Sequence, residues 1–198
     1  QGTLVMSDKI NPTDLKAFKN WFSEYLNWLM TSKNGNDEMN AKNNHGTCFT
    51  LQIAGFAKFT GDRRLLDFCI DRYKTVLLPN QMAADGSFPL EMARTKPYGY
   101  SLFNLDAMTI LCQILSTSEN NLFEYVSKEG LSIKSGIQFM YPFIIDKSKW
   151  TLKPDVMYWN DWPVAQPALI FGANAYQNQD WFNTWKKLEH QSKVNEVI

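Results

Sequence analysis

Apolar residues recur every three or four positions along most of this chain, which is the spacing of helices that bury one face. The first such run follows Asn11-Pro12-Thr13-Asp14, a typical helix start, and continues to Leu29 before the polar cluster 32–36 ends it. Strand-like alternation is nearly absent. The same spacing predicts further helices over residues 47–59, 63–78, 98–115, 131–144, 164–176 and 180–188.

The predicted helices are joined closely enough to pack as antiparallel pairs. Thr60-Gly61-Asp62 leaves room for only a tight connection between the second and third helices. No sequence repeat is visible, but one helical hairpin after another is typical of a toroid or solenoid. With a length of 198 residues, the chain is predicted to form a single all-α domain over residues 1–198.

Composition, charge and motifs exclude several classes of function. Lys+Arg and Asp+Glu both total 20, so no overall field favours nucleic acid or a membrane surface. No segment has the roughly 18 consecutive apolar residues of a membrane-spanning helix, so no membrane insertion is predicted. Cys48, Cys69 and Cys112 lack metal-ligand spacing. No phosphate-binding, dinucleotide or zinc-protease motif occurs, so neither a cofactor nor a metal is predicted.

The first candidate for chemistry is Asn43-Asn44-His45-Gly46-Thr47, where one of only two histidines lies at the mouth of a predicted helix. An imidazole has an unperturbed pKa of about 6.5, so it can act as a base near neutral pH. The flanking amides are donors that can hold a substrate carboxylate or fix the ring tautomer. A helix needs only one asparagine as its N-cap, which leaves the other available.

The second candidate is the polar stretch 80–94, which is long for a loop without structure of its own and therefore a candidate for function. Arg94 has the planar fork that binds a carboxylate in two places, although it can equally form a surface ion pair with Glu91. Tyr98 and Tyr100 follow directly, and a phenol can donate a proton to a leaving group. Either tyrosine can instead pack beneath the helix start.

Two other functions remain open from the residues alone. Two carboxylates facing one cleft would indicate a glycoside hydrolase, and the available ones are Asp85, Glu91, Asp155 and Asp161. The aromatic content of 14%, with seven tryptophans, is compatible with a carbohydrate-binding fragment that has no catalytic role, since aromatic rings often pack against sugars as well as in cores.

Taken together, the segments 42–47, 85–95 and 98–105 resemble the alginate lyase family of polysaccharide lyases. Trp159-Asn160-Asp161-Trp162-Pro163, which leads into the last long helix, fits the same resemblance. It implies an incomplete (α/α) toroid of antiparallel helical hairpins with a deep cleft, and metal-independent β-elimination on a uronic-acid polymer, alginate or a relative. The partner it implies is therefore an acidic polysaccharide, and the location a periplasmic or secreted one.

The resemblance also implies roles for individual residues. Asn44 and Arg94 would neutralise the uronate carboxylate, and His45 would abstract the C5 proton or help to bind the carboxylate. A tyrosine would protonate the leaving oxygen, and Tyr100 is preferred over Tyr98 because it aligns with the Tyr-Ser-Leu start of the following helix. The substrate-binding residues implied are Asn43, Glu91, Trp159 and Trp162. The match is to the C-terminal portion of the usual domain, so the N-terminal helices that complete the cleft are expected upstream of Gln1.

Overall fold

The computed structural model describes residues 10–192 and 194, and within them the chain is helical, so the all-α prediction is confirmed. The only strand-like pairing in this part of the chain is an isolated parallel bridge between Val164 and Glu189. A π-helical turn over Tyr73–Leu77 joins two helices. The α-helices are α2 Pro12–Thr31, α3 Lys33–Asn40, α4 Asn44–Thr60, α5 Arg63–Arg72, α6 Leu78–Gln81, α7 Pro89–Met92, α8 Pro97–Leu115, α9 Ile133–Ile145, α10 Pro167–Ala175 and α11 Gln179–Lys187.

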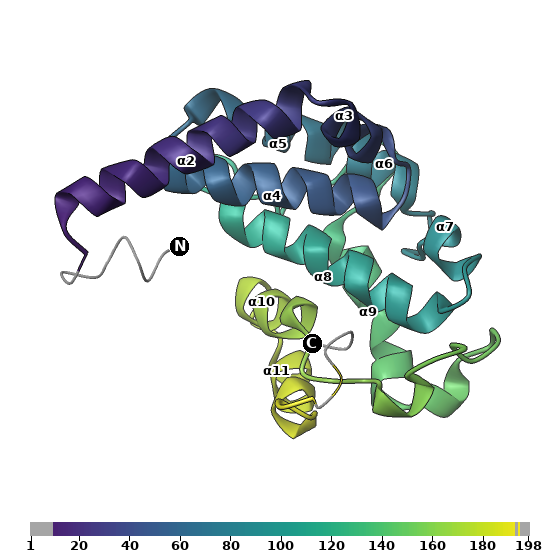
Figure 1. The fold of residues 1–198 in the computed structure, drawn as a ribbon. Coiled ribbons are helices and arrows are strands. Elements are labelled where there is room, and N and C mark those ends of the chain that lie inside the picture. Colours follow the sequence, from purple (N-terminus) through teal and green to yellow (C-terminus); the bar gives the residue numbers. More distant parts are fainter. Residues whose placement is uncertain (1–9, 193, 195–198) are drawn as a thin grey trace.

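Helix α8 is the centre of the packing. It contacts α4 on one side and α9 and α10 on another, while α2 packs on the far side of α4 and α11 packs on α10 (Figure 1). Leu102, Leu105, Met108 and Leu111 are fully buried along α8, and each such side chain stabilises the fold by roughly 1.5–3 kcal/mol. No helix among the residues described is both long and apolar enough to cross a bilayer.

Helix α3 is the clearest departure from the sequence prediction, which ended the first helix at the polar cluster 32–36 and placed no helix after it. Ser32 ends α2, but its hydroxyl also accepts a hydrogen bond from the Gly35 backbone N–H at 3.0 Å and so caps a new helix. A Cβ at Gly35 would lie 1.8 Å from the Leu29 carbonyl oxygen. Close backbone packing, rather than an apolar stripe, therefore fixes α3, and periodicity does not detect it.

Other boundaries differ from the predictions for local reasons. The helix predicted from residue 47 begins at Asn44, because Asn43 is its N-cap. The helix predicted over 63–78 continues to Gln81 through its π-helical turn, and Pro79 lies at the start of the last segment, α6. The helix predicted over 164–176 begins at Pro167. Within the polar stretch 80–94, the short helix α7 forms.

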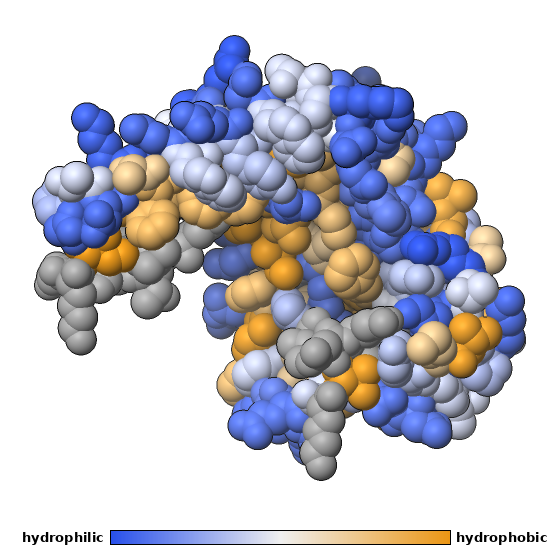
Figure 2. Space-filling model, in the orientation of Figure 1, coloured by the Kyte–Doolittle hydropathy of each residue, from blue (hydrophilic) through white to orange (hydrophobic). Residues whose placement is uncertain are grey.

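Some aromatic residues are buried in the core, and others are exposed, several of them along α2. Tyr73 and Tyr98 are fully buried, whereas Trp21 is 57% and Trp28 is 46% exposed on α2. The rings of Trp21, Tyr25 and Trp28 stack in sequence along the helix, with successive centroids 5.5 and 5.7 Å apart. Figure 2 shows apolar residues along the side of α2 that faces the hollow of the molecule. The aromatic content therefore does not all serve the core.

Asp106 is a buried carboxyl at the junction of α8 and α10. Its Oδ1 accepts a hydrogen bond from the Ala168 backbone N–H at 2.8 Å, in the first turn of α10. Burial raises the pKa of Asp106 to about 8, against the lowering effect of that hydrogen bond. The unfolded chain would ionise at about 3.9, so between about pH 4 and pH 8 the folded state holds a proton that the unfolded state has lost.

We expect Asp106→Asn to become progressively more stable than the wild type as pH rises from about 4 to about 8, by at most about 1.4 kcal/mol per pH unit. The asparagine keeps an acceptor oxygen for Ala168 but cannot ionise, so the loss of stability on ionisation disappears. Urea denaturation at intervals across this range measures the difference, with the exposed Asp67→Asn as the control for removal of one carboxylate. Parallel pH profiles for Asp106→Asn and wild type would contradict the expectation.

Candidate active site

The first turn of α4 positions the Asn-Asn-His segment. Asn43 is the N-cap, and its side-chain oxygen accepts a hydrogen bond from the His45 backbone N–H at 3.2 Å. The chain passes tightly here, because a Cβ at Gly46 would lie 2.3 Å from the Ala41 carbonyl oxygen. Asn44 is buried, whereas the His45 side chain is 49% exposed. The helix start therefore directs one amide inward and the imidazole outward.

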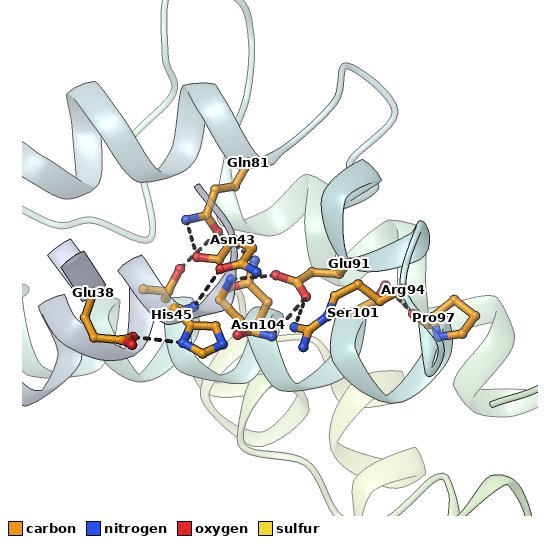
Figure 3. A network of polar contacts seen from close by, with 11 residues as sticks. Glu38, Asn43, His45, Gln81, Glu91, Arg94, Pro97, Ser101 and Asn104 are labelled. Atoms are coloured by element: carbon orange, nitrogen blue, oxygen red, sulfur yellow. Dashed lines mark hydrogen bonds and ion pairs between the residues drawn. The ribbon is translucent and has the colours of Figure 1, made fainter. Parts of the chain in front are cut away.

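The buried carboxylate of Glu91, in α7, accepts hydrogen bonds from Asn44. The backbone N–H of Asn44 donates to Glu91 Oε1 at 2.6 Å, and the Asn44 side-chain Nδ2 donates to Oε2 at 2.9 Å (Figure 3). The Arg94 Nη1 donates to the same Oε2 at 3.3 Å. Burial raises the pKa of Glu91, and the hydrogen bonds from Asn44 and Arg94 oppose that shift. Glu91 is 1% exposed, so it holds the other site residues in place rather than offering an oxygen to solvent.

Arg94 and Tyr100 form the exposed side of the same network. The Arg94 guanidinium carbon lies 3.5 Å from the centroid of the Tyr100 ring, a close cation–π contact. The Lys96 ammonium lies 5.2 Å from that ring and 5.2 Å from the ring of Tyr158. The Arg94 side chain is 29% exposed and bonds to Glu91 through Nη1, so the fork has further N–H groups for a ligand carboxylate.

The structure separates the two candidate tyrosines. Tyr98 is fully buried, its hydroxyl donates to the Phe143 carbonyl at 3.1 Å, and its ring packs edge-on against Trp150 and Trp159. Burial raises the pKa of Tyr98 far above its usual value of about 10. Tyr100 is partly exposed beside Arg94. Of the two phenols, Tyr100 is therefore the one placed to exchange a proton with a ligand.

The aromatic segment that contains Trp159 and Trp162 packs against the start of α8. Trp162 is 8% exposed, and a Cβ at Gly99 would lie 2.9 Å from its indole nitrogen. Lys147 donates hydrogen bonds to the carbonyls of Trp159 and Trp162 and lies over the Trp159 ring. Trp162 is thus largely part of the core, and Trp159 retains partial exposure.

The carboxylates that suggested a glycoside hydrolase mostly have structural partners. Both oxygens of Asp155 accept hydrogen bonds at 2.8 Å, from the Tyr98 and Gly99 backbone N–H groups at the start of α8. Asp85 accepts from the Ser87 backbone N–H in a turn, and bonding to the Ser87 hydroxyl, together with this backbone bond, lowers the pKa of Asp85. Glu91 is the buried centre described above, and Asp161 is exposed.

Two residues that the sequence did not single out complete the site. Gln81, at the end of α6, donates from Nε2 to the Asn43 carbonyl at 3.0 Å and accepts from Thr47 and Asn104. Glu38, in α3, lies with Oε2 2.8 Å from His45 Nδ1. Gln81 and Glu38 carry no motif, and only the packing of α6 and α3 against α4 brings them here. In the described part of the chain, no group of three or more His, Cys, Asp and Glu side chains has a geometry suited to a metal ion.

An imidazole, a guanidinium and a phenol thus border a buried amide–carboxylate pair on an all-helical scaffold, and these are groups that acid–base chemistry on an anionic ligand would use. A family model described as alginate lyase matches residues 3–150, and the chain belongs to the alginate lyase family. The comparison with curated proteins gives no match.

A solved structure supports the same relationship. The crystal structure of an alginate lyase from Bacteroides ovatus is similar to this chain, with a TM-score of 0.81 and 28% sequence identity. The similarity covers 94% of this chain and 49% of that one, so the chain spans about half the length of that protein.

Proposed function

We propose that the protein is a polysaccharide lyase that cleaves a uronic-acid polymer, alginate or a relative, by metal-independent β-elimination. The observation that carries the proposal is the network in which Glu91 joins Asn44 to Arg94, with Arg94 stacked on Tyr100. His45 follows Asn44 directly. Membership of the alginate lyase family supports the reaction class. We also infer that the helical pairs form part of an incomplete (α/α) toroid, and that a polymeric substrate places the protein in the periplasm or outside the cell.

In the proposed reaction, Arg94 and an amide neutralise the uronate carboxylate, which makes the C5 proton more acidic. His45 accepts that proton, with Tyr100 as the other candidate base. The electron pair of the C5–H bond forms the C4–C5 double bond, and the C4–O4 bond breaks. Tyr100 donates a proton to the departing O4, so that the products are a new chain end with a hydroxyl and an unsaturated uronate.

Ultraviolet absorbance provides the test, because the C4–C5 double bond conjugated to the carboxylate absorbs and the substrate does not. We expect absorbance to rise when the protein is mixed with alginate or with one of a panel of other uronate polymers. The responding polymer then names the substrate. A flat trace with every polymer, from protein shown to be folded by circular dichroism, would contradict the proposal. Release of reducing sugar without absorbance would instead indicate hydrolysis, and binding without either would indicate a carbohydrate-binding role.

Arg94→Lys tests carboxylate recognition separately from proton transfer. Lysine keeps the positive charge but cannot form two parallel hydrogen bonds to a carboxylate or stack as a plane on Tyr100. We expect KM to rise about tenfold or more, which corresponds to about 1.4 kcal/mol of binding, with a smaller change in kcat. The control is Arg63→Lys, at an exposed arginine paired with Asp67 on α5. An unchanged KM in Arg94→Lys would argue against the assigned role.

A further inference from the structure

The contact between α3 and His45 defines which nitrogen of the imidazole is available. Glu38 Oε2 lies 2.8 Å from His45 Nδ1, and the two side chains are about half exposed, at 52% and 49%. A carboxylate accepts hydrogen bonds, so this contact favours the hydrogen on Nδ1. The other ring nitrogen, Nε2, then carries the lone pair. In Figure 3 it points away from Glu38.

Glu38 is not on a mobile connection but on a helix fixed at both ends. At the start of α3, Ser32 caps the helix, and Gly35 allows its backbone to touch α2. At the end of α3, Arg72 of α5 donates to the Met39 carbonyl, and the same guanidinium donates from Nε to the Thr50 hydroxyl of α4 at 3.0 Å. These contacts hold α3 against α4, so the carboxylate next to Met39 has a defined place relative to His45.

We infer that Glu38 is a positioning residue, which accepts the Nδ1 hydrogen of His45 and so presents Nε2 as the proton acceptor for elimination. The inference rests on the proposed function for its catalytic consequence. A base that must take a proton needs its lone pair at the nitrogen that faces the substrate, and the hydrogen bond of the other nitrogen decides this. In this role Glu38 acts only through His45.

The neutral tautomer of His45 can be measured directly by proton–nitrogen correlation spectroscopy of the imidazole rings. The chain has only two histidines, and His190, which packs edge-on against Trp185, provides an internal reference. We expect Nδ1 to carry the hydrogen in wild type. In Glu38→Ala we expect a shift of His45 toward the Nε2-protonated form. Glu38→Gln keeps an acceptor oxygen of similar reach and is expected to restore much of the wild-type tautomer.

Kinetic measurements on Glu38 variants provide a second test of the positioning role. We expect Glu38→Ala to lower kcat by about tenfold or more, a part of the 10²–10⁴-fold contribution of general acid–base catalysis, with KM within a factor of about two. Glu38→Gln should recover most of kcat. The matched control is Asp37→Asn, which removes a neighbouring carboxylate of α3 that pairs with Lys33 and not with the site. This variant should match wild type.

The spectroscopic and the kinetic experiments together distinguish failure of this inference from failure of the proposed function. A His45 tautomer that is the same with and without Glu38, or a kcat of Glu38→Ala equal to that of Asp37→Asn, would overturn the positioning role. If the wild-type protein forms no absorbing product with any polymer, the proposed function fails. The ring resonances then decide by themselves whether Glu38 orients His45.

Discussion

Replacing Tyr100 with phenylalanine is expected to lower kcat for elimination at least a hundredfold while the fold stays intact. The change removes only the hydroxyl, and the Arg94 guanidinium can still stack on the ring, 3.5 Å from its centroid in the wild type. Without the phenol, the departing oxygen has no proton donor at this position, and general acid–base catalysis contributes about 10²–10⁴-fold. Initial rates of ultraviolet absorbance measure the loss, and His45→Ala is expected to cause one of at least similar size.

The matched control is Tyr98→Phe, two positions earlier on the same helix. Its hydroxyl bonds to the Phe143 carbonyl in the core, so the expected effect is a loss of about 1 kcal/mol of stability and elimination within a few-fold of wild type. Near-normal rates in both Tyr100→Phe and His45→Ala would refute the assignment of the site. An inactive but folded Tyr98→Phe beside an active Tyr100→Phe would reverse the roles of the two tyrosines.

Replacing Glu91 with alanine is expected to cause the largest loss of stability among single changes in the site, about 3–5 kcal/mol. The substitution leaves the buried backbone N–H and side-chain amide of Asn44 without acceptors and removes the partner of Arg94. A buried donor without a partner costs about 1–3 kcal/mol. Glu91→Gln keeps one acceptor and should lose less. Urea denaturation measures both variants.

Glu91→Ala should also weaken the reaction, because Asn44 and Arg94 lose the group that orients them. We expect kcat/KM to fall in Glu91→Ala under conditions where the variant is still folded. The control is Glu119→Ala, at an exposed glutamate, which should change neither stability nor rate appreciably. Wild-type stability in Glu91→Ala would show that the Asn44–Glu91–Arg94 network does not hold the site together.

Most of the helices were predictable because the spacing of apolar residues within each segment shows which face of that helix is buried. The positions of α2, α4, α8, α9 and α11 followed from apolar spacing, and the cap at Asn11 gave the start of α2. Helix α3 was missed because the one residue it buries is Gly35. A glycine adds nothing to an apolar pattern, and its close approach to α2 exists only once the two helices have packed.

The residue types of the candidate site were predictable, but which of these residues are buried and which are accessible was not. Consecutive residues of an α-helix are about 100° apart, so Tyr98 and Tyr100 face nearly opposite directions, and only the packing of α8 decides which one is buried. In the same way, Glu91 was as good a candidate for a ligand contact as Arg94 until α7 placed it beneath Asn44, with a sequence separation of 47 residues.

The sequence by itself determined that this chain is helical, and it placed the imidazole, amide, guanidinium and phenol of the proposed acid–base site in two short motifs. These features depend on residue type and spacing, which the chain carries before it folds. Only the tertiary structure decided that Tyr100 is accessible and Tyr98 is not. It also decided that the buried Glu91 bonds to Asn44 and Arg94, and that Glu38 lies beside His45. Each of these depends on which groups lose water and which partners replace it when α3, α4, α7 and α8 pack together.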